Sequence, residues 1–262
     1  MKTYKDVLQN KDHTALIPFF VLGDPDFETS FELIKTAIDS GADVLELGIA
    51  FSDPIADGPT IQKADIRALN SGMNCLRAFE LISRIKAYKD IPIGLLMYYN
   101  LICNYGTEKF FKDAAGAGVN SVLIADLSID DADEVIPAMD AANLDTVFMV
   151  TSITDKERMH RIADKTTGFI YAVSLLGVTG SRNTVSDTVG DLVKNIQEIT
   201  DVPVCVGFGI SSAKQAETVA QTGAQGVIIG SRIVGIIEAN LKDVNKMQLE
   251  ISNFLRDVRA VL

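Results

Sequence analysis

The stretch SGADVLELG at residues 40–48 returns in outline as AGVNSVLIA at 117–125 and as TGAQGVIIG at 222–230. In each copy a glycine follows a helical pattern, and a short apolar run follows the glycine. Glycine readily takes the left-handed conformation that ends a helix. A short apolar run bounded in this way is typical of a strand covered on both faces. The chain therefore contains a repeated helix–strand unit.

A second pattern opens the apolar run with proline, as in IPFF at residues 17–20, and proline is tolerated at the first residue of a strand. Strands that alternate with helices imply right-handed crossovers and a parallel sheet. Eight such units favour a single (β/α)8 TIM barrel with extra short helices, formed by residues 1–262. The expected strands lie near 15–21, 43–48, 92–97, 120–125, 145–150, 168–173, 203–206 and 226–229. Helical patterns include 27–39, 75–88, 107–116, 130–142, 187–199, 211–222 and 242–260.

The alternative to a barrel is a doubly wound open sheet that binds a dinucleotide. The chain lacks the G-x-G-x-x-G fingerprint of that fold, because GFG at 207–209 continues as ISS. It also lacks the G-x-x-x-x-G-K-[ST] loop that cradles nucleotide phosphates. The sequence therefore favours the closed barrel.

Composition limits the classes of partner. The formal net charge of −11 argues against nucleic acid and anionic lipid as partners. The three cysteines and two histidines form no metal-ligand pattern, so no metal is expected. No apolar run has the roughly 18 residues that a membrane span needs, and the first residues resemble no signal peptide. We expect a soluble, cytoplasmic protein.

The carboxyl ends of the strands, where barrel enzymes carry their active sites, contain one conspicuous acid. Glu46 lies late in the second expected strand, on the face opposite Leu45 and Leu47. Burial of a carboxylate is costly and raises its pKa, which suits a general acid or base. The alternative is a structural carboxylate paired with a buried lysine or hydroxyl.

The loop that follows, residues 48–60, carries Asp53 and Asp57 among prolines and glycines. Such a rigid, polar loop near the barrel mouth places an aspartate where it can face Glu46 across a ligand. The alternative for either aspartate is a cap on a turn or helix, which is the interpretation we adopt for Asp53.

Three further loops are candidates for ligand binding. VGFGIS at 206–211 and IGSR at 229–232 each join an expected strand to a helix, and glycine with a helix N-terminus suits a phosphate group. Loops after strands seven and eight often bind phosphate in this fold. The loop at 177–184 is either a mobile lid that excludes water or a passive surface loop.

A resemblance to a known family rests on LELGIAFSDPIADGPTIQ at residues 45–62, which closely resembles the signature of tryptophan synthase alpha subunits. Further short runs are similar to family motifs and follow in family order over nearly the whole chain. They are PF at 18–19, LGDP at 22–25, LMY at 96–98 with Asn100, GVTG at 177–180, GFGIS at 207–211 and GS at 230–231. The resemblance implies retro-aldol cleavage of indole-3-glycerol phosphate to indole and glyceraldehyde 3-phosphate.

The same resemblance implies roles for individual residues. Glu46 would be the acid/base, and Asp57 would accept a hydrogen bond from the indole N–H. The phosphate would be held by Gly180, Gly209, Gly230 and Ser231. The indole pocket would be walled by Phe19, Leu96, Tyr98, Tyr171 and Phe208, while Thr179 would belong to the lid. No cofactor is implied, because pyridoxal phosphate belongs to the beta subunit, the expected partner in an alpha2beta2 tetramer.

The chain departs from the family pattern in three loops. Ala50 replaces a usual proline, Ser128 stands where proline commonly follows the fourth strand, and the segment 151–154 lacks prolines. Loss of proline loosens a loop by up to about 1 kcal/mol of chain entropy. The resemblance implies that the second and fourth loops lie on the side that meets the beta subunit, so we expect the departures to affect partner binding more than catalysis. The family pattern further implies a cis peptide bond between Asp24 and Pro25.

Three alternatives to a coupled alpha subunit stay open at this stage. One is an activating subunit without useful catalysis, and another is a stand-alone lyase that releases indole without a partner. The third is a different phosphate-binding barrel, which the stretch at 45–62 argues against.

Overall fold

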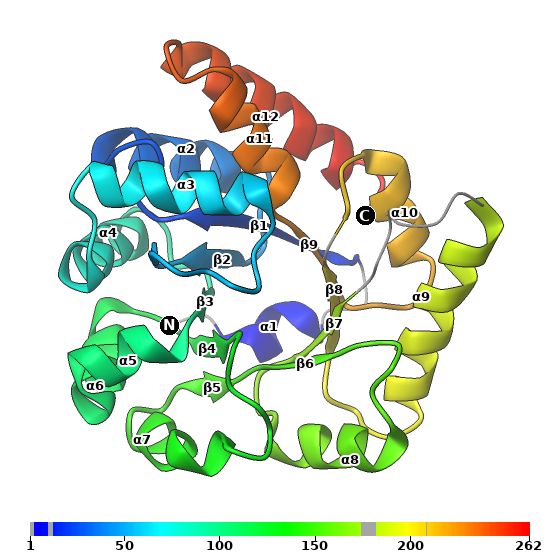
Figure 1. Ribbon diagram of the computed structural model, residues 1–262. Coiled ribbons are helices and arrows are strands. Elements are labelled where there is room, and N and C mark those ends of the chain that lie inside the picture. The colour runs from blue at the N-terminus through cyan, green and yellow to red at the C-terminus, as the bar shows by residue number, and fades with distance from the viewer. Residues whose placement is uncertain (1–2, 10–12, 174–181, 208) are drawn as a thin grey trace.

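A computed structural model describes residues 3–9, 13–173, 182–207 and 209–262 (Figure 1). Its strands are β1 (Ala15–Val21), β2 (Leu45–Gly48), β3 (Ile93–Met97), β4 (Ser121–Ile124), β5 (Asp145–Thr146), β6 (Phe148–Val150), β7 (Ile170–Val173), β8 (Val204–Gly207) and β9 (Gly226–Ile229). They form one sheet in the order β5-β4-β3-β2-β1-β9-β8-β7-β6, and every pair in the sheet is parallel.

The two edges of this sheet meet in one segment of chain, which closes the barrel. Only Val147 separates β5 from β6, and its N–H donates to the carbonyl oxygen of Val122 at 3.3 Å. On the other side, the Gly168 N–H donates to the carbonyl oxygen of Thr146 at 3.1 Å. The expected strand at 145–150 is thus interrupted at Val147, and the expected (β/α)8 barrel is confirmed.

Helices surround the barrel, except for α1, which lies inside the ring of strands (Figure 1). Those in the first half are α1 (Tyr4–Leu8), α2 (Phe27–Asp39), α3 (Pro59–Asn70), α4 (Cys75–Tyr88), α5 (Tyr99–Tyr105) and α6 (Thr107–Ala117). A 3-10 turn at Ala132–Glu134 precedes α7 (Ile136–Ala141), α8 (Lys156–Lys165), α9 (Arg182–Gln197), α10 (Ala213–Ala220), α11 (Ser231–Ala239) and α12 (Val244–Arg259). None of the helices in these described ranges is long and apolar enough to cross a membrane.

The helical patterns given from the sequence do not include α1, α3, α5, α8 or α11. In α11, Ile233, Val234, Ile236 and Ile237 are buried on one face of the helix, and Ser231, Arg232 and Ala239 are exposed on the other. Helix α8 is mostly charged and buries only a short stripe around Met159 and Ile162. Both helices nevertheless complete the alternation that the repeat predicts.

Helix α1 lies inside the ring of strands and closes the amino end of the barrel (Figure 1). Its Tyr4, Val7 and Leu8 belong to the buried interior cluster of the barrel. The Tyr4 hydroxyl forms a 2.9 Å hydrogen bond with Ser121 Oγ on β4. The interior is therefore a packed core below the level at which ligands can enter.

The turn after β1 contains the expected cis peptide bond between Asp24 and Pro25. The carboxylate of Asp24 is buried and accepts two hydrogen bonds from Arg67 on α3, at 2.6 and 2.8 Å. This paired interaction fixes α3 against the first loop of the barrel.

Close packing at Gly94 on β3 gives a test of how α1 packs into the amino end of the barrel. A β-carbon there would lie 2.5 Å from the Tyr4 hydroxyl and 3.0 Å from Ser121 Oγ. We expect Gly94→Ala to lower the free energy of unfolding by about 1–3 kcal/mol, because the core must shift to admit the methyl group. Urea unfolding would measure this change.

The matched control is Gly116→Ala on α6, where a β-carbon meets no atom within 4 Å. That substitution should be neutral or stabilising by up to about 1 kcal/mol. Adding Tyr4→Phe to Gly94→Ala should recover part of the loss by removing the hydroxyl. Wild-type stability of Gly94→Ala alone would contradict the described packing.

Candidate active site

Glu46 lies on β2 with its side chain in the barrel interior. The side chains of Leu45 and Leu47 pack instead into the core between strands and helices, as strand alternation requires. Glu46 is 4% exposed and lies beside Phe19 on β1 and Gly94 on β3 in the sheet register. Burial, and secondly the charge of Asp57, raise the pKa of Glu46 to about 8. The carboxyl group therefore keeps its proton at neutral pH.

Asp57 ends the loop from β2 to α3, directly before Gly58, the N-cap residue of α3. Its Oδ2 accepts a 2.7 Å hydrogen bond from the hydroxyl of Tyr98, and that hydroxyl accepts one from the Ala56 N–H at 3.1 Å. Burial raises the pKa of Asp57 above its ordinary value, and the hydrogen bond from Tyr98 opposes that shift. The donor thus favours an ionised carboxylate at Asp57.

The two carboxyl groups line one cavity of about 130 Å³ at the carboxyl ends of the strands. The remaining lining residues are Phe19, Gly58, Ile61, Leu96, Tyr171, Gly209, Ile210, Ser211, Ile228, Gly230, Ser231 and Arg232. Part of the lining is apolar, and part comes from the turns after β8 and β9. The cavity combines two acids of unequal proton affinity with an apolar surface and glycine-rich turns.

Most residues expected from the sequence meet in this cavity. Of the twelve, Glu46, Asp57, Phe19, Leu96, Tyr171, Gly209, Gly230 and Ser231 line it. Tyr98 is buried behind the loop, where it holds Asp57 and does not line the cavity. Thr179, Gly180 and Phe208 lie outside the described residues, as do most of the expected lid residues.

The lining also contains residues that the sequence analysis did not select. Gly58 and Ile61 belong to the family-like stretch at 45–62, while Ile210 and Ser211 belong to the expected phosphate loop. Arg232 follows Ser231 in the first turn of α11, and its guanidinium group lies 5.7 Å from the centroid of the Phe254 ring on α12.

The turn at Gly230 is shaped by a close contact. Gly230 is the N-cap residue of α11, and a β-carbon there would lie 3.1 Å from the ring of Phe19. Gly209 has φ of 78°, in the left-handed region that favours glycine. The two glycines let main-chain atoms approach a ligand at this wall, where α11 presents its positive dipole end.

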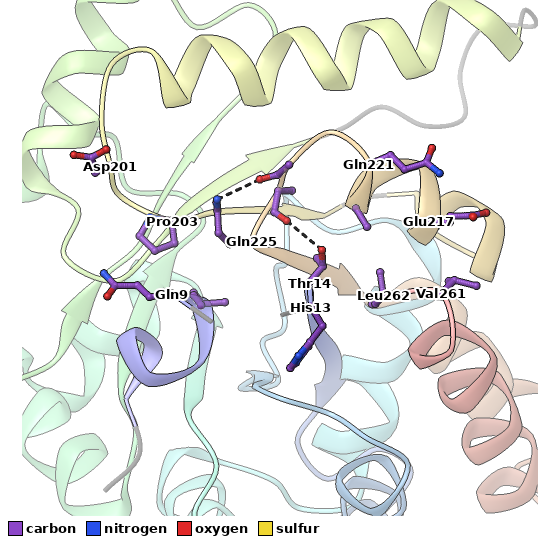
Figure 2. Close-up of a pocket in the computed structure, with 14 residues that line it drawn as sticks. Gln9, His13, Thr14, Asp201, Pro203, Glu217, Gln221, Gln225, Val261 and Leu262 are labelled. Atoms are coloured by element: carbon purple, nitrogen blue, oxygen red, sulfur yellow. Dashed lines mark hydrogen bonds between the residues drawn. The ribbon is translucent and has the colours of Figure 1, made fainter. Parts of the chain in front are cut away.

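A larger cavity of about 790 Å³ lies at the opposite end of the barrel (Figure 2). It is lined by residues that precede strands, including Thr14 before β1, Pro203 before β8 and Gln225 before β9. The paired carboxyl groups are not part of it. Since barrel active sites lie at the carboxyl ends of strands, the smaller cavity is the candidate site.

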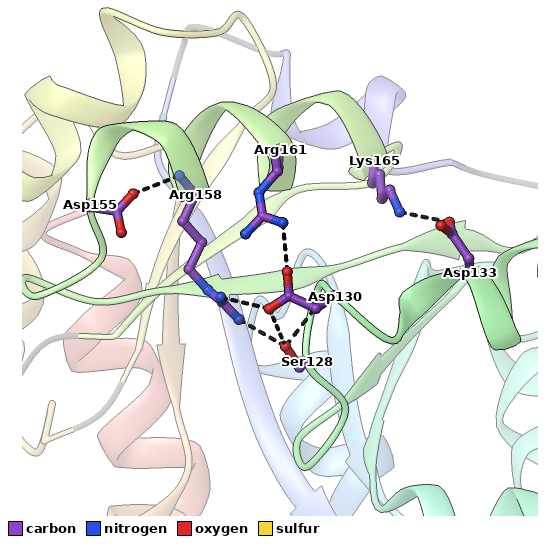
Figure 3. A network of polar contacts seen from close by, with 7 residues as sticks. All are labelled: Ser128, Asp130, Asp133, Asp155, Arg158, Arg161 and Lys165. Carbon is purple, nitrogen blue, oxygen red and sulfur yellow. Dashed lines mark hydrogen bonds and ion pairs between the residues drawn. The ribbon is translucent and has the colours of Figure 1, made fainter.

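Polar contacts hold the loop after β4, where Ser128 replaces the usual proline (Figure 3). The hydroxyl of Ser128 accepts a 2.8 Å hydrogen bond from Arg158 on α8. Asp130 accepts from Arg158 at 2.8 Å and from Arg161 at 2.6 Å, and these donors lower its pKa to about 2. Lys165 pairs with Asp133 at 2.6 Å. Contacts with α8 thus restrain a loop that lacks proline.

The segment 151–154 is closed by its threonines. The Thr151 N–H donates to Thr154 Oγ1 at 3.0 Å, and the Thr154 N–H donates to the Thr151 carbonyl oxygen at 3.1 Å. These bonds form a tight turn without proline and leave Ile153 at its tip, 92% exposed.

No group of three or more potential metal ligands occurs among the described residues. The fold and cavity define the class: a (β/α)8 barrel with a paired-acid site at the carboxyl ends of its strands. Sequence comparison then identifies the family. A family model described as tryptophan synthase alpha chain matches residues 6–261, and the chain belongs to this family. Its members are the subunits that cleave indole-3-glycerol phosphate in tryptophan biosynthesis, and this chain is such a carbon–carbon lyase.

Individual relatives agree over nearly their full length. The tryptophan synthase alpha chain of Methanothermobacter thermautotrophicus is 43% identical over 258 residues, covering 98% of this chain and 96% of the relative. A crystal structure of the alpha subunit from Legionella pneumophila superimposes with a TM-score of 0.91 at 29% identity, covering 100% and 98% of the two chains. A structure from the tryptophan synthase α2β2 complex of Pyrococcus furiosus gives 0.87 at 35% identity, covering 95% and 98%.

Proposed function

We propose that Glu46 and Asp57 carry out the cleavage, with Glu46 as acid and base and Asp57 as the partner of the indole nitrogen. The observation that carries this proposal is that both carboxyl groups line one cavity and differ in proton affinity. A pKa of about 8 makes Glu46 a proton donor at neutral pH. The hydrogen bond from Tyr98 favours the ionised form of Asp57, which suits an acceptor.

The steps balance without an external acid or base. Glu46 gives its proton to indole C3, and positive charge develops on the ring nitrogen. The ionised Asp57 accepts the hydrogen bond of that N–H and stabilises the charge. The Glu46 carboxylate then takes the proton of the adjacent glycerol hydroxyl. The C–C bond breaks as the carbonyl of glyceraldehyde 3-phosphate forms, and its electron pair returns to the indole ring. Glu46 ends protonated, and these steps require no metal or organic cofactor.

The phosphate end of the substrate requires hydrogen-bond donors or positive charge, whereas the indole end requires an apolar surface. We assign the phosphate to Gly209, Gly230 and Ser231, supported by the N-terminus of α11. The family pattern adds Gly180. We assign the indole ring to Phe19, Leu96 and Tyr171, and the family pattern adds Phe208. Tyr98, which that pattern also includes, holds Asp57 from outside the cavity. Thr179 belongs to the lid in the same assignment.

Substitution of the two acids tests these roles. We expect Glu46→Gln to lower kcat for indole release by about 10³–10⁴-fold, because the amide cannot transfer protons. Asp57→Asn should lower kcat by about 10²–10³-fold, because it removes the negative charge opposite the indole nitrogen. Indole release from indole-3-glycerol phosphate by the purified chain is the measurement.

Asp53→Asn is the matched control, since Asp53 is exposed in the same loop and outside the cavity. It should leave indole release by the isolated chain within about threefold of wild type. Wild-type activity in Glu46→Gln would overturn the assignment of the acid/base.

We further propose that this single barrel domain works in the cytoplasm as the alpha partner in an α2β2 tetramer with a beta subunit. The Pyrococcus furiosus relative comes from such a complex. Two apolar side chains at the carboxyl end of the barrel support a docking surface: Ile55 is 80% exposed in the loop after β2, and Ile153 is 92% exposed after β6. The phosphorylated substrate is charged and is retained inside the cell.

Charged substitutions at these tips test the partner. Ile153→Asp and Ile55→Asp should each weaken beta-subunit binding by about tenfold or more, because they place a charge in an apolar contact. Indole release by the isolated chain should not change. Leu249→Asp is the control, because Leu249 is 60% exposed on the outer helix α12. Equal binding by all three variants would exclude this surface, and equal indole release with and without beta would indicate a stand-alone lyase.

A further inference from the structure

A third carboxyl group, that of Asp65 on α3, lies behind the loop that carries Asp57. Asp65 is 5% exposed, and its Oδ1 accepts a long hydrogen bond of 3.4 Å from the Phe51 N–H. Its Oδ2 is buried and has no hydrogen-bond partner in the part of the chain that the structure describes. A buried polar atom without a partner is costly, so a carboxyl group at this position requires a reason.

A short series of contacts connects Asp65 to Asp57. The ring of Phe51, whose N–H meets Asp65, stacks on the ring of Tyr98 with centroids 5.3 Å apart and planes inclined by 29°. The hydroxyl of Tyr98 donates to Asp57 and accepts from the Ala56 N–H. Asp65 therefore holds the main chain at the start of the loop, and Tyr98 holds its end.

We propose that Asp65 is a positioning residue for the cleavage reaction, which anchors the loop bearing Asp57 through the Phe51 main chain and does so as the uncharged acid. This inference rests on the proposed role of Asp57. Asp65 does not line the cavity, so it acts through the loop and not on the substrate.

The charges around Asp65 favour its uncharged form. Helix α3 carries two positive charges, and each has another partner. Arg67 donates to both carboxylate oxygens of Asp24, and Lys63 forms an ion pair with Glu238 on the neighbouring α11. The charges that act on Asp65 are the carboxylates of Asp57, in the loop, and of Asp24, after β1. Each of them opposes a further negative charge.

Burial first, and the charge of Asp57 second, raise the pKa of Asp65 to about 7. Asp65 therefore holds its proton below that pH and ionises as the pH rises through it. Ionisation places an unpaired charge under the loop and repels Asp57. The cleavage rate should fall in this range, before Glu46 loses its proton near its own pKa of about 8.

Two substitutions distinguish the hydrogen bond that Asp65 accepts from the Phe51 N–H from the ionisation of Asp65. Asp65→Asn retains an oxygen that accepts from the Phe51 N–H but cannot ionise. We expect its kcat/KM to stay within about threefold of wild type at pH 6. Its pH profile should lack the decrease near pH 7 and keep the decrease near pH 8. Asp65→Leu lacks the acceptor and should lower kcat/KM by about 10–30-fold at every pH, because the loop is misplaced.

The probe is indole-3-glycerol phosphate, and Asp39→Asn on the outer helix α2 is the control, with an expected profile equal to wild type. A wild-type decrease near pH 7 that persists in Asp65→Asn would overturn the proposal. If Asp65→Leu does not fold, the pH profile of Asp65→Asn decides alone.

A double substitution shows whether Asp65 acts through Asp57. In the Asp57→Asn background, adding Asp65→Leu should cost less than about threefold, because the group it positions is already gone. A full 10–30-fold loss there would overturn the proposed connection. Wild-type activity in Asp57→Asn alone would refute the role of Asp57. A strong loss in Asp57→Asn with no effect of Asp65→Leu would refute only the inference about Asp65.

Discussion

The site depends on the burial of one carboxyl group, Glu46, at the centre of a closed barrel. A single acid at this position costs several kcal/mol if it ionises without a partner. The barrel tolerates it because the group keeps its proton, and the negative charge of Asp57 reinforces that state. Because burial disfavours the ionised form of Glu46, it raises the pKa of this group to a value at which the group can donate a proton at neutral pH.

The surrounding structure maintains the difference between the two acids. Closure of the sheet through Val147 and the plug formed by α1 exclude water from below Glu46. Tyr98 donates to Asp57 and keeps it closer to ionisation than Glu46. The two acids share one cavity but have different tasks. Burial raises the pKa of Glu46 with no hydrogen bond to oppose it, whereas the hydrogen bond from Tyr98 opposes the rise at Asp57.

Periodicity and the repeated glycine were sufficient to predict the barrel and the position of Glu46, because strand alternation determines which face a side chain takes. The role of Asp57 required the resemblance carried by residues 45–62. The contact of Tyr98 with Asp57 joins residues 41 apart in sequence, and no local pattern encodes it. Asp65 was overlooked because it lies in α3, which was not among the expected helices, and an aspartate outside a strand ordinarily faces solvent.

The central claim is that Glu46 holds a proton at neutral pH because it is buried next to Asp57. Difference infrared spectroscopy of the isolated chain against Glu46→Gln measures this most directly, through the carbonyl stretch of the protonated carboxyl group. We expect that signal to persist at pH 7 and to titrate near pH 8, and Asp57→Asn should move the titration to lower pH. A Glu46 signal that disappears near pH 4.5, the ordinary value for glutamate, would contradict the account.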